Sequence, residues 1–229
     1  MFITFEGIEG TGKSTQVARL GARLRAAGYR VRTTIEPGGT PLADAIRAVW
    51  LHPNESLEAV RAANLARPGE PAETMLPITE ALLISAARAQ HVAHMREWLA
   101  AGEVVVSDRY ADSTRAYQGF GSGADMGAIE TLEQMATGGL HPDLTFLLDL
   151  APSEGKERKQ QGHAAGDDLN WLDQKELAYL ERVRAGYLEL ARAEPQRWVI
   201  LDAAQPPDAL AEQVWVLVSG DMHLHNAQA

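Results

Sequence analysis

The sequence predicts an α/β protein built on a five-stranded parallel sheet with helices on both faces. Short apolar runs alternate with longer amphipathic stretches, and several runs are almost continuously apolar, as strands covered on both faces require. Parallel strands need long crossovers, which the amphipathic stretches supply as helices. The expected strands are 2–6, 29–35, 103–108, 144–150 and 197–202.

Three long stretches carry helical periodicity and separate the strands. They cover residues 14–28, 78–102 and 172–194, and Gly28 is placed to end the first of them as its C-cap. We expect residues 1–219 to form a single domain, because no linker and no internal repeat interrupts the alternation.

Three segments depart from this alternation. Residues 51–77 contain four prolines and little periodicity, which predicts an excursion from the core. Residues 156–171 are polar almost throughout, so we expect an exposed, mobile loop that acts as a lid. Residues 220–229 are expected to be a flexible tail.

The composition is that of an ordinary soluble globular protein and favours a small-molecule ligand over a polymer or a membrane. Hydrophobic residues make up 45% of the chain and charged residues 23%. The net charge is 21 − 31 = −10, which disfavours a nucleic acid polymer as partner. No apolar run reaches the roughly 18 residues of a membrane span, and the first strand leaves no room for a signal peptide. With no cysteine in the chain, we expect a cytoplasmic protein without disulfides or thiolate metal sites.

The strongest functional signal is GIEGTGKS, which fits the pattern G-x-x-x-x-G-K-[S/T]. It follows the first expected strand and opens the first expected helix, so its backbone N–H groups and the helix N-terminus can hold phosphate. A glycine-rich turn without a ligand is the alternative interpretation. The residues expected to bind ATP are Gly7, Ile8, Glu9, Gly10, Thr11, Gly12, Lys13, Ser14 and Thr15.

Two strands end on an aspartate that could complete a metal site. Ser14 is expected to hold Mg²⁺ through its hydroxyl, and Asp108 is the better candidate for the second oxygen ligand because Arg109 follows it directly. Asp149 is expected to have a structural role. The chain has no N-K-x-D element of the kind that selects guanine, so a small kinase is favoured over a GTP-dependent switch protein.

Four further segments carry a family resemblance. EPGGT (36–40), AARAQH (86–91), DRYADSTRAYQG (108–119) and VRAGYLELA (183–191) occur in the order found in bacterial thymidylate kinases, and with the phosphate loop the chain resembles that family over most of residues 1–219. The resemblance implies a P-loop NTPase fold with a lid, Mg²⁺ as cofactor, ATP and dTMP as substrates, dTDP as product and a homodimer.

The resemblance also implies roles for individual residues. Lys13, Arg109 and Arg158 match the family's catalytic cations, with Arg158 acting from the lid. Tyr117 matches the tyrosine beneath the deoxyribose, and Ile84 the residue that faces the base. The positions that match substrate-binding residues are Glu36, Arg47, Ile84, Arg88, Arg109, Thr114, Tyr117 and Gln118.

Three positions differ from the usual family pattern. Ile35 and Trp171 stand where arginine is common, and Ile84 stands where most members have phenylalanine. Two alternatives therefore remain: a nucleoside monophosphate kinase of other base preference, and an ATP-binding regulatory module without transfer activity. His91 and His94, three residues apart, suit a metal site poorly because no third ligand is evident.

Overall fold

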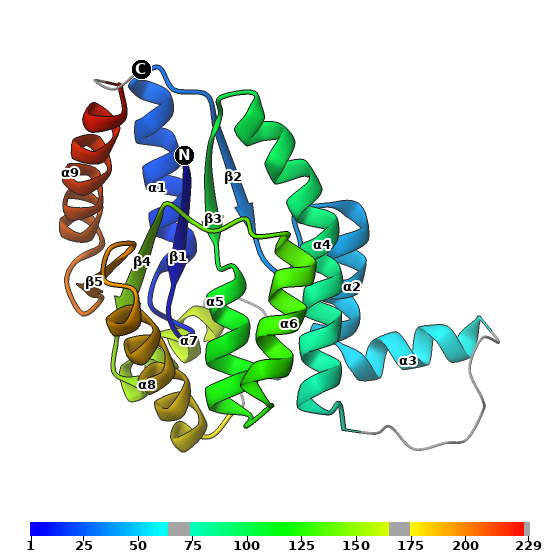
Figure 1. Cartoon of the computed structure of the whole chain (residues 1–229). Coiled ribbons are helices and arrows are strands. Elements are labelled where there is room, and N and C mark those ends of the chain that lie inside the picture. Colours follow the sequence, from blue (N-terminus) through cyan, green and yellow to red (C-terminus); the bar gives the residue numbers. More distant parts are fainter. Residues whose placement is uncertain (64–73, 165–174, 227–229) are drawn as a thin grey trace.

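The computed structural model describes residues 1–63, 74–164 and 175–226. Its centre is one five-stranded sheet with the order β2-β3-β1-β4-β5, in which every neighbouring pair is parallel (Figure 1). All five expected strands are confirmed. Their bounds are β1 Phe2–Glu6, β2 Val31–Ile35, β3 Val104–Asp108, β4 Leu144–Asp149 and β5 Trp198–Asp202.

Helices connect the strands and cover both faces of the sheet. The three expected helices are confirmed as α1, α4 and α8, the last of which begins a few residues later than the pattern predicts. The helical elements are α1 Lys13–Ala26, α2 Pro41–Leu51, α3 Pro53–Ala62, α4 Pro77–Ala100, α5 Ala111–Thr114, the π-helix η1 Arg115–Gly121, α6 Met126–Thr137, α7 Pro152–Ala164, α8 Leu177–Ala193 and α9 Pro207–Asn226.

Alternation along each strand divides the core into layers. Ile3 and Phe5 of β1 pack in the cluster that includes residues of α1 and α9, whereas Phe2 packs in the cluster that includes residues of α4. Val105 of β3 lies on the α4 face with Phe2. The central strands β1, β3 and β4 are therefore buried on both faces, which explains why they are almost continuously apolar.

The expectation of a loop at the lid is wrong for residues 156–164, which lie in α7. Pro152 begins this helix, a position that suits its fixed φ, and the residues that follow are mostly good helix formers. Its buried residues are Pro152 and Gly155, so it packs at its start and shows no amphipathic pattern. Residues 165–171 lie outside the described residues, and so does Trp171.

The other two irregular segments also contain helix. Within 51–77, α3 projects from the body of the molecule (Figure 1), and residues 64–73 lie outside the described ranges. The expected flexible tail is helical as far as Asn226, where α9 ends. Val214 and Val218 of the same helix are buried in the core. Among the described helices, none is long and apolar enough to cross a membrane.

Candidate active site

The glycine-rich loop at residues 7–15 joins the end of β1 to the start of α1 and has the geometry of a phosphate cradle. Gly10 and Gly12 adopt φ of 77° and 88°, which side chains other than glycine rarely tolerate. Lys13 begins α1, and its Nζ folds back to donate a hydrogen bond to the Ile8 carbonyl at 2.7 Å. The loop thus presents backbone N–H groups, a helix N-terminus and an ammonium group in one place.

The ammonium group of Lys13 is buried beside other charges. Burial lowers the pKa of Lys13 from 10.5 to about 8, and the charge of Arg109 acts in the same direction. The carboxylates of Asp108, Glu9 and Glu6 oppose the shift. An anionic ligand in the loop would supply the negative charge that this lysine needs to remain protonated.

The two expected Mg²⁺ ligands are in contact. The Ser14 hydroxyl donates a hydrogen bond to Asp108 Oδ2 at 2.5 Å. Both are oxygen donors, and a pair of protein oxygens suits Mg²⁺, which usually keeps several waters and binds phosphate oxygens. Asp149, at the end of β4, instead accepts a bidentate ion pair from Arg184, at 2.6 and 2.8 Å, in agreement with its expected structural role.

Arg109 directly follows β3 and has a strained backbone. Its φ is 72°, and among the described residues it is the single non-glycine residue with positive φ. This conformation directs a half-buried guanidinium towards the phosphate loop. The two terminal nitrogens, Nη1 and Nη2, donate hydrogen bonds to Gly7 O, Ser113 Oγ, Tyr187 Oη, Glu9 Oε1 and Tyr117 Oη at 2.8–3.2 Å.

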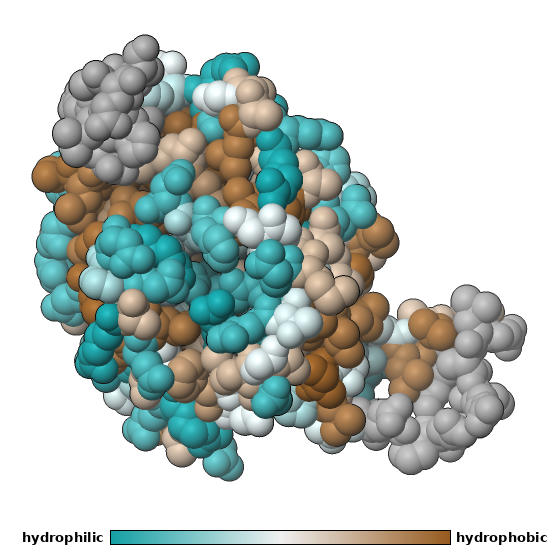
Figure 2. Space-filling model, viewed as in Figure 1, coloured by the Kyte–Doolittle hydropathy of each residue, from teal (hydrophilic) through white to brown (hydrophobic). Residues whose placement is uncertain are grey.

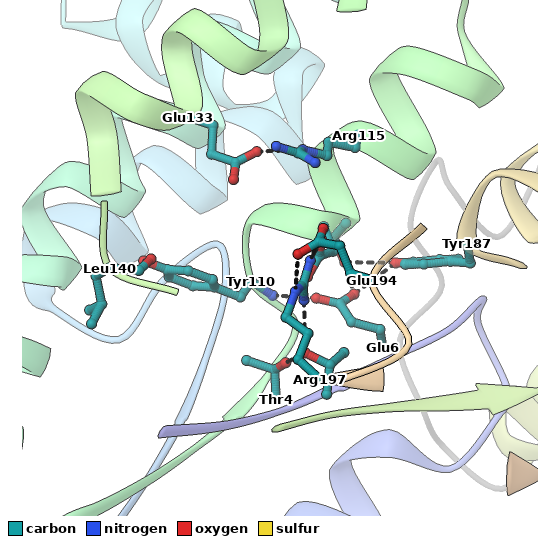
Figure 3. Close-up of polar contacts among 12 residues, drawn as sticks. Thr4, Glu6, Tyr110, Arg115, Glu133, Leu140, Tyr187, Glu194 and Arg197 are labelled. Carbon is teal, nitrogen blue, oxygen red and sulfur yellow. Dashed lines mark hydrogen bonds and ion pairs between the residues drawn. The ribbon is translucent and has the colours of Figure 1, made fainter. Parts of the chain in front are cut away.

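Glu6 supports Arg109 through shared hydrogen-bond partners and was not found from the sequence. Its fully buried carboxylate accepts hydrogen bonds from Tyr110 N–H at 2.7 Å, Ser113 Oγ at 2.6 Å and Tyr187 Oη at 2.9 Å (Figure 3). The last two side chains also contact Arg109. Burial, with the nearby Asp112 carboxylate, raises the pKa of Glu6 from 4.5 to about 7. A carboxylate that ends a buried strand was the signal that could have revealed it.

A second group of polar side chains is buried around Arg88 of α4. Arg88 Nε donates to Glu36 Oε2 at 2.7 Å, and Nη2 donates to Tyr110 O and to Thr114 Oγ1. The other Glu36 oxygen is 2.9 Å from His91 Nδ1. Arg88 Nη1 is buried and has no hydrogen-bond partner among the described residues, so one charged donor of the fork is left for a ligand.

Gln118 lies in η1 close to this group. Its Nε2 donates to Glu80 Oε2 at 3.0 Å, while its Oε1 is buried with no partner in the described part of the chain. Burial raises the pKa of Glu80, and the hydrogen bond from Gln118 opposes that shift. The buried side chain of Ile84 is a further neighbour. Glu80 was not found from the sequence, because its partner is 38 residues away.

Most of the expected substrate residues line one cavity. It is formed by Glu9, Glu36, Pro37, Trp50, Ile84, Arg88, Arg109, Tyr110, Ser113, Thr114, Tyr117 and Gln118. A neighbouring cavity contains Lys13, Ser14, Asp108 and Arg109, and Arg47 also lines it. Arg47 Nη1 donates to Pro37 O at 2.8 Å; burial and the charge of Arg109 lower the pKa of Arg47. Arg47 thus lines the cavity of the phosphate loop and not the first cavity.

Arg158 reaches the phosphate loop from α7. It lines the cavity that contains Lys13 and a further one beside Gly12, and its Nη1 donates to Ala203 O at 2.9 Å. The start of α7 touches the loop backbone: a Cβ on Gly10 would lie 2.3 Å from the Gly155 carbonyl oxygen. The two segments therefore approach closely because both residues lack a side chain.

The histidines on α4 do not form a metal cluster. His91 is occupied by Glu36 and by Thr34, whose Oγ1 lies 2.8 Å from its Nε2, and His94 lies near Glu97. Within the described ranges, no group of three or more histidine, aspartate or glutamate side chains is arranged to hold a metal ion.

The parallel sheet, its order and the cradle between β1 and α1 together define a P-loop NTPase fold. The thymidylate kinase family model matches residues 5–67 and 63–214, and the chain belongs to the thymidylate kinase family. It is 48% identical to the thymidylate kinase of Thermomicrobium roseum over 219 residues, which cover 95% of this chain and 94% of that protein.

Other relatives agree. The thymidylate kinase of Deinococcus radiodurans is 46% identical over 224 residues, covering 97% of this chain and 98% of that protein. Among solved structures, the thymidylate kinase of Ehrlichia chaffeensis superposes with a TM-score of 0.69 at 27% identity, covering 96% of this chain and 98% of that chain. In each comparison the match covers nearly the full length of both proteins.

Proposed function

We propose that this chain transfers the γ-phosphoryl group of ATP to dTMP, giving ADP and dTDP. One observation supports this most directly. Arg109 and Glu9 line both the cavity of the phosphate loop and the cavity of the buried polar groups. A donor phosphate in the first and an acceptor monophosphate in the second would meet at these two residues, as direct transfer between them requires.

The donor is held by the phosphate loop in this proposal. Backbone N–H groups and Lys13 bind the β- and γ-phosphates, and Ser14 and Asp108 hold Mg²⁺ together with its waters. The metal neutralises charge on the phosphates of ATP when it is bound. The contact between Ser14 and Asp108 supports this assignment, because both oxygens face one small region beside Lys13.

Arg109 positions the acceptor phosphate, and Arg47 adds a second cation on the same side. A guanidinium fork suits phosphate oxygens because two parallel N–H groups match them. Tyr117 packs against Arg109, with the guanidinium carbon 4.9 Å from the ring centroid, and lines the cavity where the sugar would lie.

Thymine is bound deeper in the same cavity. The free Arg88 Nη1 suits a carbonyl acceptor such as O4, and the free Gln118 Oε1 suits a donor such as N3–H. Ile84 packs against the base face in place of an aromatic ring, which supplies apolar contact without stacking. Glu36 lines the cavity, but both of its oxygens are bonded to protein groups, so we assign it to positioning Arg88.

Arg158 supplies the catalytic cation from α7, because the phosphate loop contains no arginine.

We also propose a homodimer in the cytoplasm. Leu42 and Val49 of α2 and Ile78 and Leu82 of α4 are exposed on helices that pack together, and Figure 2 shows hydrophobic surface on the side that carries α3 and the start of α4. Exposed apolar surface of this kind is typical of subunit contacts.

A coupled assay of ADP release across dTMP, dUMP, dCMP and dGMP tests the proposal. We expect dTMP to give the highest kcat/KM, with dTDP as the product. Preference for another acceptor would instead identify a kinase of different base selectivity. ATP binding without any product would identify a regulatory module.

A further inference from the structure

Glu80 is a buried carboxylate that reaches the cavity proposed to bind the base (the base cavity) through Gln118 and Trp50, which both line it. It lies in the first turn of α4 and is 5% exposed, yet it is not among the residues that line the cavity. Its Oε2 accepts the hydrogen bond from Gln118 Nε2 at 3.0 Å. A carboxylate is costly to bury, so its presence here needs a reason.

The chemistry of this pair fixes the orientation of the Gln118 amide. An ionised carboxylate accepts hydrogen bonds and donates none, whereas an amide has a donor end and an acceptor end. In the structure Gln118 turns its NH₂ group towards Glu80 and its carbonyl oxygen elsewhere, the orientation that an ionised Glu80 favours. That oxygen is the buried Oε1 without a partner among the described residues, on a side chain that lines the cavity.

The orientation decides which pyrimidine edge fits. Arg88 Nη1 offers a donor and Gln118 Oε1 an acceptor, which match the O4 and N3–H of thymine or uracil. Cytosine has the opposite pattern, with an amino group at C4 and an acceptor at N3. Cytosine would place its amino group against the Arg88 donor and its N3 acceptor against Gln118 Oε1. Both buried protein groups would then lack a hydrogen bond, and a site rejects such a ligand strongly.

We propose that Glu80 is a positioning residue that gives the site its selectivity against cytosine by locking the Gln118 amide. The inference rests on the proposed dTMP kinase activity and adds a residue that does not touch the substrate. It does not concern the choice between thymine and uracil, because the two share the edge that Arg88 and Gln118 face.

The Glu80→Gln variant tests this directly. A glutamine can accept from or donate to Gln118, so the amide becomes free to turn. We expect the ratio of kcat/KM for dTMP over dCMP to fall by about tenfold or more, while the ratio for dTMP over dUMP stays unchanged. The affinity of dCMP as a competitive inhibitor gives the same ratio where its turnover is slow.

Two further variants separate selectivity from folding. Glu80→Met removes the carboxylate at similar volume and should lower the dTMP-over-dCMP ratio in the same way. Glu133→Gln is the matched control, because Glu133 is also buried and pairs with Arg115 at 2.7 Å, outside the residues that line the cavity. It should leave both ratios unchanged.

The outcomes distinguish this inference from the proposed function. A purely structural role for Glu80 would lower kcat/KM for dTMP, dUMP and dCMP together, and unchanged ratios in folded Glu80→Gln and Glu80→Met would overturn the inference. Failure of the wild-type enzyme to phosphorylate dTMP would overturn the proposed function instead. Melting temperatures of all variants show that the comparison is made on folded protein.

Discussion

The guanidinium of Arg109 donates a hydrogen bond from Nη2 to Glu9 Oε1 at 2.8 Å, which joins the end of β3 to the phosphate loop. The same carboxylate accepts from Tyr117 Oη at 2.9 and 2.8 Å, and Tyr117 also receives a bond from Arg109. Three side chains from three segments thus form one closed polar cluster where the two cavities meet.

Replacing Arg109 with lysine should disable this cluster. An ammonium group offers three donors from a single nitrogen, whereas Arg109 uses two separate nitrogens to reach five acceptors. We expect kcat/KM for dTMP to fall by about 10²-fold or more, measured by steady-state ADP release. Arg32→Lys is the control, since Arg32 pairs with Glu103 at the sheet edge. Wild-type activity in Arg109→Lys would exclude Arg109 from acceptor binding.

Arg158→Ala should separate catalysis from acceptor binding. Arg158 lines the phosphate cavity but not the base cavity, so its removal should leave dTMP affinity nearly intact. We expect kcat to fall by about 10³-fold or more, the effect typical of an arginine at a transferring phosphoryl group. Calorimetric titration gives the affinity for dTMP, and Arg192→Ala removes an exposed arginine of α8 as a control. A fully active Arg158→Ala enzyme would place the catalytic cation elsewhere.

Lys13→Met should abolish activity and yet raise the melting temperature. The pKa of Lys13 is 10.5 in the unfolded chain and about 8 in the folded protein. Burying the protonated side chain therefore costs stability at neutral pH. Between these values the wild type gains stability as pH rises. The advantage of Lys13→Met should therefore be largest below about pH 8 and shrink above it. Thermal melts across this range measure it; a gain that stays constant with pH would contradict the explanation.

Glu6→Gln should change how stability depends on pH. The folded protein keeps the Glu6 proton up to about pH 7, and the unfolded chain releases it near 4.5, so this group's contribution to stability is full at low pH and declines as pH rises between these values. Glutamine removes the decline, so the wild type should lose melting temperature relative to Glu6→Gln across this window. Glu189→Gln, an exposed position, should show no such trend. Parallel curves for wild type and Glu6→Gln would contradict the raised pKa.

The strands and the phosphate loop could be predicted from the sequence because their signals are local. β1 is an apolar run that ends directly before the glycines, and its bounds agree with the expectation. The polar stretch in α7 has no helical signal in its sequence, because the buried residues of this helix are Pro152 and Gly155 at its start and it needs no apolar face. Composition alone cannot separate such a helix from an exposed loop.

The supporting residues of the site could not be predicted for a different reason. Glu6 meets Tyr187 across 181 residues, and Glu80 meets Gln118 across 38, so each pair exists only after the sheet and helices have assembled. Residues that match family positions could be named in advance. Those that hold them in place are visible only in three dimensions.

The close contact between Gly155 and Gly10 lies in the first turn of α7, so any rotation of this helix would turn about that contact. With a rise of about 1.5 Å per residue, Arg158 lies about 4.5 Å along the helix from that contact and Ala164 about 13.5 Å. Any rotation of α7 about its first turn would therefore sweep the far end roughly three times as far as the arginine. The cation that we propose for catalysis is therefore carried close to the contact with Gly10, on the part of α7 that such a rotation would displace less than its far end.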